Sequence, residues 1–272
     1  MTTTRISVIV PTYNQAKYLP TCLDSVWFQE WDDLEIIVVN DGSTDDTRPV
    51  LEHYQQGLDK DETSFASRYD AATDTVARTF HKRYDFGRRV FRVLHLERNG
   101  GLSAALNTGF SLATGALCTF TASDDILLPH MLAELEQAMT SHGADFAYAD
   151  MHIVDDDGRI LRRFALPDYS FQACFGDWYL CGVSKLYKKE LHDRFGLYDS
   201  AYTVQDHELY LRFALGGAKF IHVPKVLLHS RIHAKDRQVD NHSAQGMSRL
   251  YRESAQLVQL ARTARGADAT AP

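Results

Sequence analysis

The sequence lacks the marks of several protein classes. Its four cysteines form no CxxC pair, so nothing indicates a zinc ribbon or a redox pair. No apolar run approaches the ~20 residues of a membrane span, and the run near the N-terminus is too short for a signal peptide. The formal net charge is −7, whereas a nucleic-acid partner needs a basic face. We expect a cytoplasmic protein without a nucleic-acid partner; peripheral attachment to the inner face of a membrane stays open.

An alternation of strand and helix patterns fills the first half of the chain. Nearly continuous apolar runs at 6–11, 34–39, 91–96 and 116–121 are typical of strands covered on both faces. Helical spacing follows at 16–29, from Pro49, at 102–113 and at 129–142. This order predicts an α/β, Rossmann-like domain with a mainly parallel central sheet and helices on both faces.

The rhythm changes after Tyr148. Residues 150–164 form two strand-like runs around Asp157-Gly158, which predicts a small antiparallel hairpin extension. Helices are expected at 188–196, 206–217 and from 243, and two extended segments broken at Pro224 at 219–233. We expect one domain over 1–242, then a C-terminal helix and frayed tail over 243–272, which could lead into a further domain of a longer protein.

One segment of this domain, 58–90, does not follow the alternation and is expected to be a surface insertion. It is long, charged and only partly periodic. Its stretch Ala72–Tyr84 could form an amphipathic helix. The sequence assigns the insertion no role.

Polar clusters follow the four apolar runs. They are PTYN from Pro11, NDGSTDD from Asn40, NGG from Asn99 and SDD from Ser123. Because parallel strands end at one edge of a sheet, where ligands of such sheets bind, we expect these clusters to meet.

Asp124 and Asp125 are adjacent carboxylates at a strand end. They stay ionised together only beside a positive charge, which Mg²⁺ or Mn²⁺ would supply. The alternative is an N-cap pair for the helix near Pro129. Neither GxxxxGK[ST] nor GxGxxG occurs, so a metal would carry most of a bound diphosphate's charge. The carboxylate of Asp41 could accept hydrogen bonds from the N–H groups of a base or the O–H groups of a ribose.

Five segments together carry a family resemblance: ISVIVPTYNQAKYLPTCLDSVWFQ, LEIIVVNDGSTDDT, NGGLSAALNTGFSLATG, TASDDILLP and QDHELYLRFA. In this order, over most of residues 5–233, the chain resembles the family 2 glycosyltransferases of the GT-A fold. The resemblance implies an inverting hexosyl- or N-acetylhexosaminyltransferase of polysaccharide biosynthesis. It would move a sugar from a nucleoside-diphosphate donor, most commonly a UDP-sugar, to a hydroxyl of a glycan or glycolipid acceptor.

The resemblance also implies residue roles. The residues it places at the donor nucleotide are Pro11, Thr12, Tyr13, Asp41, Asn107 and Asp124. The metal ligands it implies, for Mn²⁺ or Mg²⁺, are Asp124, Asp125 and His233. It makes Asp206 the general base, although its spacing alone favours an N-cap.

Two departures from the family pattern keep a second hypothesis open. Ala122 stands where relatives often have an acid, and Leu106 stands where they often have Arg or Lys. Both changes weaken expected metal or donor binding, so a catalytically silent nucleotide-sugar or glycan-binding domain is the alternative. A nucleotidyltransferase would need a Gly-rich basic loop, which PTYNQAKYL is not.

The remaining candidates have structural alternatives. Trp178 and Tyr179 could form an acceptor wall by stacking on sugar rings, or pack in the core. A lone His such as His233 is commonly structural. The acidic run 155–157 is interpreted as a solvated turn, and the lysines of 185–189 as a solvated helix face.

Overall fold

The computed structural model describes residues 4–58, 60, 64–182, 184–233 and 244–268. The elements up to the middle of the chain are β1 (Ile6–Thr12), α1 (Leu19–Trp27), β2 (Leu34–Asn40), α2 (Thr47–Leu58), β3 (Ser64–Asp70), β4 (Thr75–His81), β5 (Val90–His95), α3 (Leu102–Leu112), β6 (Leu117–Phe120), β7 (Ile126–Leu127) and α4 (Met131–His142). The others are β8 (Phe146–Val154), β9 (Ile160–Phe164), the π-helix η1 (Gln172–Asp177), β10 (Ser184–Lys188), α5 (Glu190–Phe195), α6 (Gln205–Leu215), β11 (Phe220–Arg231) and α7 (Ala244–Asp268).

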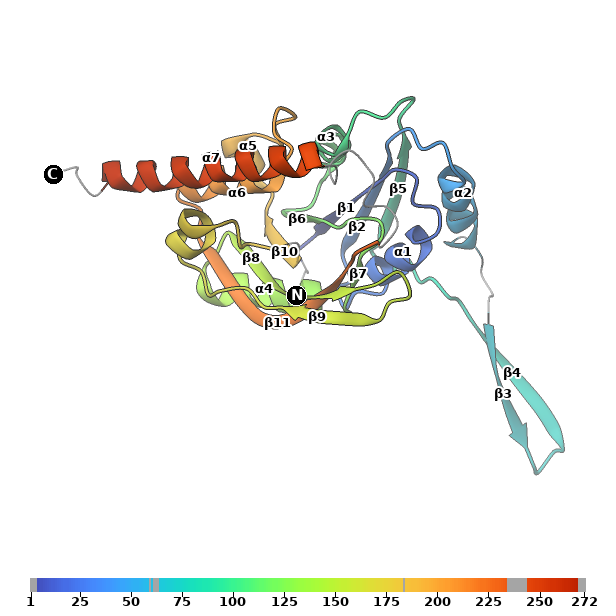
Figure 1. Cartoon of the computed structure of the whole chain (residues 1–272). Helices are drawn as coiled ribbons and strands as arrows, with labels where there is room; N and C mark the ends of the chain where they lie inside the picture. Colours follow the sequence, from blue (N-terminus) through green and yellow to red (C-terminus); the bar gives the residue numbers. More distant parts are fainter. Residues whose placement is uncertain (1–3, 59, 61–63, 183, 234–243, 269–272) are drawn as a thin grey trace.

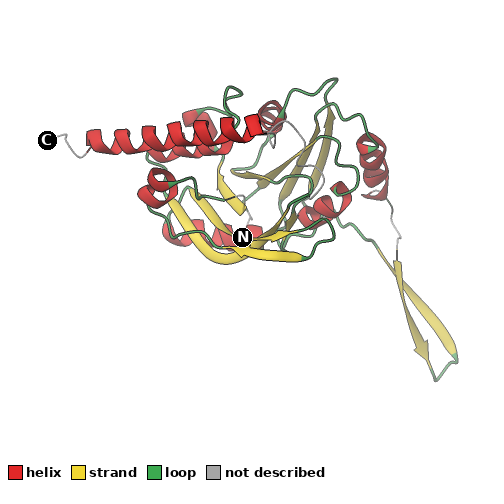
Figure 2. Cartoon of the chain, viewed as in Figure 1, coloured by secondary structure: helices red, strands yellow, loops and turns green. Residues whose placement is uncertain are grey.

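One large sheet organises the molecule, with helices on both faces (Figures 1 and 2). Its strand order is β5-β2-β1-β6-β10-β8-β11-β7, and β9 pairs with β8. Strands β5, β2, β1 and β6 run parallel. Strand β10 is antiparallel to both neighbours, while β8 and β11 are parallel to each other. The predicted α/β fold with a mainly parallel sheet is confirmed.

Two apolar clusters lie on the two faces of this sheet. Every residue of β1 and β2 is buried. Because successive side chains of a strand point to opposite faces, Val8 packs in one cluster and Ile9 in the other. Gly109 brings α3 close to β1, because a Cβ at this position would lie 2.5 Å from Cγ2 of Ile9. The four cysteines are buried thiols, as expected of small apolar side chains.

The second half of the chain confirms the β8–β9 hairpin and the helices α5 and α6. Two expectations are wrong. Strand β11 continues through Pro224, since register shifts between Val223 and Leu228 accommodate the proline. Lys185 and Lys188 lie in β10 rather than on a helix face, because SKLYK pairs between β6 and β8. Within the described residues, no helix combines the length and apolarity needed to cross a membrane.

The helix expected within Ala72–Tyr84 is also wrong. Strand β4 pairs with β3 as a separate two-stranded sheet, which projects from the body near α2 (Figure 1). Thr75, Val76 and Thr79 are β-branched and favour an extended backbone. A helix at this place would also lack a neighbouring surface on which to bury one face.

Candidate active site

A pocket lies where β1 and β2 end and α3 begins. It has a volume of about 220 Å³ and is lined by Pro11, Thr12, Tyr13, Asp41, Asn99, Gly101, Leu102 and Ala105. The four residues predicted to surround and bind a nucleobase thus line one pocket. The hydroxyl of Thr12 is buried beneath this pocket without a hydrogen-bond partner.

Asp41 holds one wall of this pocket in place. Its Oδ1 accepts a hydrogen bond from the amide of Gly100 at 2.8 Å, and its Oδ2 accepts one from Gly101 at 2.9 Å. The amide of Asp41 itself donates to the Thr12 carbonyl at 2.9 Å. Asp41 therefore connects the ends of β1 and β2 to the start of α3. Each carboxylate oxygen keeps a second lone pair for a ligand.

Asp124 and Asp125 follow β6, and neither caps α4. The N-cap of α4 is His130 and has no side-chain cap bond. Asp125 is 4% exposed, and its Oδ1 accepts the amide of Arg231 at 3.0 Å. Burial, and then the charge of Asp124, raise the pKa of Asp125 to about 7, against the lowering effects of Arg231, Ser230 and Lys185. An added cation would keep both acids ionised.

His233 connects Asp124 to an acid of the hairpin turn. Its Nε2 lies 2.7 Å from Oδ2 of Asp124, and its Nδ1 is bonded to Oδ1 of Asp156. The Tyr18 hydroxyl also donates to Asp156, at 2.8 Å, and the Tyr18 ring lies 4.8 Å from the His233 ring. Burial lowers the pKa of His233, but the bonds to Asp156 and Asp124 outweigh it and raise this pKa.

Arg231 fixes the same corner from the end of β11. Its Nε donates to the carbonyl of Asp124 at 3.1 Å, and its Nη1 donates to the carbonyls of Asp155 and Asp156 at 2.7 and 3.0 Å. The guanidinium lies 4.7 Å from the centre of the Tyr18 ring. The turn of the β8–β9 hairpin is thereby tied to the loop that follows β6.

The residues at this corner fit a divalent cation that also binds phosphate. Within the described residues no three His, Cys, Asp or Glu side chains form a ready-made cage. Metals that bind phosphates usually take only one or two protein carboxylates. Asp124 and His233 present an oxygen and a nitrogen side by side, where a cation would take the place of the proton that they now share, and Asp156 orients the imidazole, as carboxylates behind metal-bound histidines do. Oδ1 of Asp125 is already bonded to Arg231.

Asp206 lies in the first turn of α6, whose N-cap is Val204. It is therefore not the N-cap that its spacing favours. Its Oδ1 is buried without a hydrogen-bond partner, and its Oδ2 lies 3.9 Å from Nζ of Lys185. Burial raises the pKa of Asp206, and Lys185 opposes the rise. A carboxylate with a raised pKa is suited to accept a proton.

Lys185 is a buried cation between the two groups of acids. Its side chain is 1% exposed, and Nζ lies 3.3 Å from the centre of the Phe120 ring. Burial lowers the pKa of Lys185 to about 8, while the charges of Asp206 and Asp125 oppose this. A buried lysine is rare unless it is paired, so this ammonium serves as counter-charge at the centre of the site.

The remaining predicted residues lie around these groups. The amide of Asn107 exchanges two hydrogen bonds of 2.9 Å with the backbone of Tyr198, so it holds the loop before α6. Tyr179 stacks on His207 at 4.9 Å, and its hydroxyl is buried without a partner. Trp178 is 39% exposed and lies 6.3 Å from the Tyr251 ring on α7.

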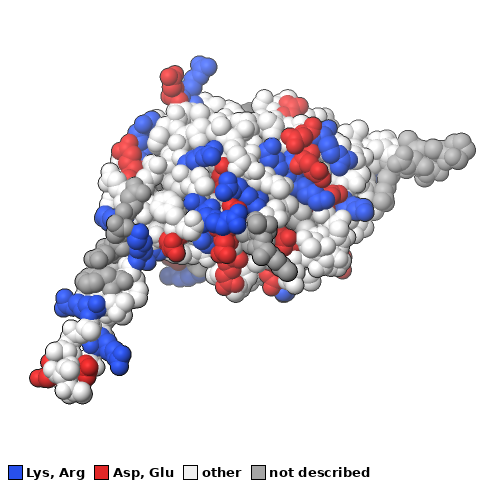
Figure 3. Space-filling view, turned by 180° about the vertical axis from the view of Figure 1, so that it is seen from behind, with Lys and Arg blue, Asp and Glu red and all other residues white. Residues whose placement is uncertain are grey.

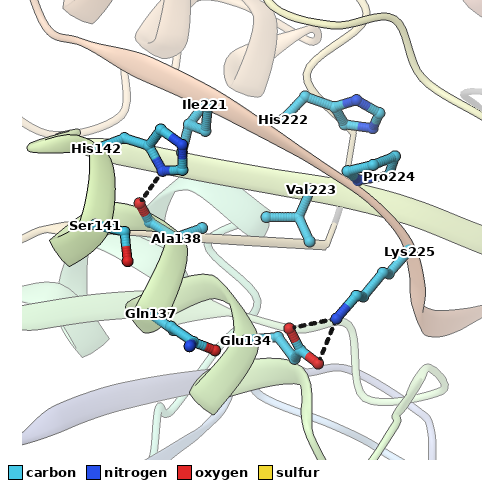
Figure 4. Close-up of a pocket in the computed structure, with 10 residues that line it drawn as sticks. All are labelled: Glu134, Gln137, Ala138, Ser141, His142, Ile221, His222, Val223, Pro224 and Lys225. Carbon is cyan, nitrogen blue, oxygen red and sulfur yellow. Dashed lines mark hydrogen bonds and ion pairs between the residues drawn. The ribbon is translucent and has the colours of Figure 1, made fainter.

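A separate hollow lies between α4 and β11 (Figure 4). Its volume is about 390 Å³. At one end Lys225 pairs with Glu134 at 2.7 Å, and at the other His142 bonds the carbonyl of Ala138. No residue predicted for the site lines this hollow.

The sequence interpretation missed three residues of the site. Asp156 was expected at a solvated tip, as its neighbour Asp157 is, with a side chain 68% exposed. Tyr18 carried no signal. Lys185 carried no signal either, because a lysine in a sequence pattern such as SKLYK is ordinarily exposed.

The comparison with known families decides the identity. The sequence profile described as glycosyl transferase family 2 matches residues 7–64 and 69–214. The chain belongs to this family. Glycosyltransferase GlyG of Streptococcus pneumoniae is 29% identical over 202 residues, covering 68% of this chain and 57% of GlyG. Glycosyltransferase GlyA of the same organism is 28% identical over 203 residues, covering 74% and 22%. The chain thus spans about half of one relative and a fifth of the other.

Solved structures agree on a GT-A fold for this chain. S. aureus TarS 1–349 in complex with UDP superposes with a TM-score of 0.65 at 20% identity, covering 94% of this chain and 65% of that one. The mannosyltransferase PcManGT from Pyrobaculum calidifontis, in complex with GDP-Man and Mn²⁺, gives 0.64 at 18% identity, covering all of this chain and 76% of that one.

Proposed function

We propose that this glycosyltransferase is an inverting enzyme that uses a nucleoside-diphosphate sugar, with UDP as the favoured nucleotide. The observation that carries the proposal is the pocket of about 220 Å³ at the ends of β1 and β2. It is smaller than the ~300–1,000 Å³ of drug-sized ligand pockets and suits a base rather than a whole nucleotide sugar. The UDP and UDP-GlcNAc complexes of TarS favour uracil, and the GDP-Man complex of PcManGT makes guanine the competitor.

From this pocket the donor would extend toward Asp124. Asp124 and His233, supported by Asp125, would hold Mn²⁺ or Mg²⁺ against the diphosphate. The metal, when bound, neutralises the charge of the departing nucleotide diphosphate. Arg231 and Asp156 keep the two ligand side chains in place through the contacts described above. Ala122 and Leu106 remove charged groups that many relatives have, so the chain relies on Asp124 and His233 for this task.

Asp206 would act as general base. The hydroxyl of the glycan or glycolipid acceptor passes its proton to the carboxylate while its oxygen attacks the anomeric carbon. The bond from that carbon to the diphosphate breaks on the opposite face, so configuration inverts and no covalent intermediate forms. Lys185 and the N-terminal end of α6 favour the ionised carboxylate that this step needs. Trp178 and Tyr179 are the proposed acceptor side.

Two measurements together test the proposal. Thermal unfolding is followed with UDP, GDP, ADP and CMP, with and without Mn²⁺. A ligand at a hundred times its Kd should add about 2.7 kcal/mol of stability, and we expect UDP with Mn²⁺ to give the largest shift. Release of UDP from a panel of UDP-sugars is then measured. Binding without any turnover would identify the chain as a silent nucleotide-sugar-binding domain, and no shift with any nucleotide would contradict both readings.

A further inference from the structure

The β3–β4 hairpin is the part of the chain that the proposed function does not use. It pairs from Ser64 with His81 to Asp70 with Thr75 and projects from the body (Figure 1). All of its described side chains are exposed. A two-stranded sheet is at best marginally stable alone in water, so a face of this hairpin is expected to gain from contact with another surface.

The two faces of the hairpin differ in chemistry. Directly paired residues share a face, so Tyr69 and Val76 share one with Phe65 and Arg78. Phe65, Tyr69 and Val76 are 51%, 61% and 59% exposed. On the opposite face, the apolar side chains that the structure describes are only alanines, Ala66 and Ala77, and they accompany Arg68, Asp70, Thr75, Thr79 and His81. We call the first the aromatic face.

A cation within the aromatic face decides between possible occupants. The guanidinium of Arg78 lies 4.7 Å from the centre of the Phe65 ring. Two copies packed through this face would bring two arginines into one apolar interface, which costs free energy. An anionic lipid headgroup would pair with Arg78, while the rings enter the interfacial region that aromatic residues favour.

The charges at the tip of the hairpin determine how the hairpin would be oriented on a membrane. Basic side chains run along its length, and acidic ones gather at the end (Figure 3). The acids are Asp70 and Asp74, and the hydroxyl of Tyr69 bonds Asp74 at 2.9 Å. Anionic lipid would repel an acidic tip that entered first. We propose that the aromatic face binds the headgroup region of an anionic phospholipid bilayer, with the hairpin lying along the surface.

The chain that leaves β4 is anchored to the body of the domain. Arg83 pairs with Asp24 at 2.7 Å, and the hydroxyl of Tyr84 donates to the same carboxylate at 2.8 Å. Tyr84 and Phe86 pack edge-on against Trp27 of α1, with ring centres 5.6 and 5.1 Å apart. A hairpin held on the membrane would therefore hold the whole domain there, in keeping with a lipid-linked acceptor.

Sedimentation with vesicles tests this inference without a known acceptor. The full chain is mixed with vesicles of phosphatidylcholine, with and without phosphatidylglycerol. We expect binding to the vesicles that contain phosphatidylglycerol, weakened by salt. Phe65→Ser with Tyr69→Ser, and separately Arg78→Glu, should each reduce the apparent affinity about tenfold. Arg68→Glu is the matched control, because it makes the same change in net charge on the opposite face.

Three results would overturn the inference. The first is a wild-type chain that sediments with neither type of vesicle. The second is an equal loss of binding in Arg68→Glu and Arg78→Glu, which would indicate general charge attraction. The third is a dimer by light scattering that Phe65→Ser with Tyr69→Ser dissociates, which would assign the face to a second copy. Thermal unfolding and nucleotide binding of each variant confirm that the body, far from the substitutions, is intact.

Discussion

The two halves of the site, named by their proposed roles, differ in how their polar groups are paired: the donor side holds Asp41, Asp124, Asp156 and His233, and the base side holds Asp206, Tyr179 and His207. On the donor side, Asp41, Asp124, His233 and Asp156 all have hydrogen-bond partners within the chain. On the base side, Oδ1 of Asp206, the hydroxyl of Tyr179 and both ring nitrogens of His207 are buried without one.

This difference indicates that the two sides are preorganised to different degrees. A fully bonded network keeps its geometry before the ligand arrives, so the donor side is preorganised. The Thr12 hydroxyl is the exception on the donor side, because it is buried without a partner. Unpaired buried polar groups each cost ~1–3 kcal/mol, so the base side carries a cost in stability that the donor side avoids.

The largest expected effect comes from breaking the base side itself. Asp206→Asn removes the proton acceptor and should lower transfer ~10²–10⁴-fold. Nucleotide binding, measured by thermal shift, should stay within a factor of about two, because Asp206 lies outside the donor network. Normal turnover in this variant would remove Asp206 from the base role.

The counter-charge of Asp206 comes next. Burial raises the pKa of Asp206 and Lys185 lowers it, so Lys185→Met should raise this pKa further and move the acid limb of the rate profile to higher pH. Activity at pH 7 should fall and should return at higher pH, where the carboxylate is again ionised. Tyr179, Tyr187, Tyr198 and Tyr210 also surround Asp206, but they stay neutral over this range.

Two further variants sharpen the Lys185 test. Lys185→Arg keeps a cation beside Asp206, so the acid limb of its rate profile should stay at the wild-type pH. Lys188→Met is the control, because Lys188 bonds Asp145 away from the site. An unchanged profile in Lys185→Met would show that the ammonium does not act on Asp206.

On the donor side, Asp156→Asn should have a smaller effect than Asp206→Asn or Lys185→Met has on the base side. The asparagine still reaches His233 but loses the negative charge that orients and polarises the imidazole. Loss of such a supporting carboxylate typically weakens metal affinity ~10–100-fold, so the Mn²⁺ concentration that gives half of the thermal shift with UDP should rise by that factor. Asp157→Asn, one residue along the same turn, should change nothing. Equal effects of the two variants would mean that only net charge matters.

The same comparison shows what sequence reasoning could reach. The β1, β2 and β6 runs predicted the sheet and put Thr12, Asp41 and Asp124 at its edge, because strand ends are set by local pattern. Asp156 could not be found, since its role depends on the β8–β9 hairpin folding back onto Tyr18 and His233. The stretch 72–84, which contains β4, was interpreted as a possible amphipathic helix, because the isolation of the β3–β4 hairpin, which removes any helix-packing surface, is a property of the whole fold.

The smallest expected effect concerns the unpaired imidazole of His207, which stacks on Tyr179. Burial lowers the pKa of His207 to about 4, so between the unfolded value of ~6.5 and 4 the unfolded chain binds the extra proton. The free energy of unfolding therefore falls as the pH drops through this window. His207→Phe should reduce that fall and, by removing unpaired nitrogens, raise stability at pH 7 by about 1 kcal/mol.

His192→Phe is the matched control for this measurement. Burial also lowers the pKa of His192 to about 4, but its ring bonds the Tyr187 hydroxyl at 3.1 Å and the Gly196 carbonyl at 3.2 Å. His192→Phe should therefore lower the free energy of unfolding at pH 7. Like His207→Phe, it should also reduce the fall of this free energy as the pH drops toward 4. If His207→Phe also raises the KM for acceptor in a working assay, the unpaired nitrogens belong to acceptor binding. A lower stability of His207→Phe at pH 7 would instead mean that the ring nitrogens of His207 have hydrogen-bond partners in the folded chain. The difference in pairing between the two sides of the site would then rest on Asp206 and Tyr179 alone.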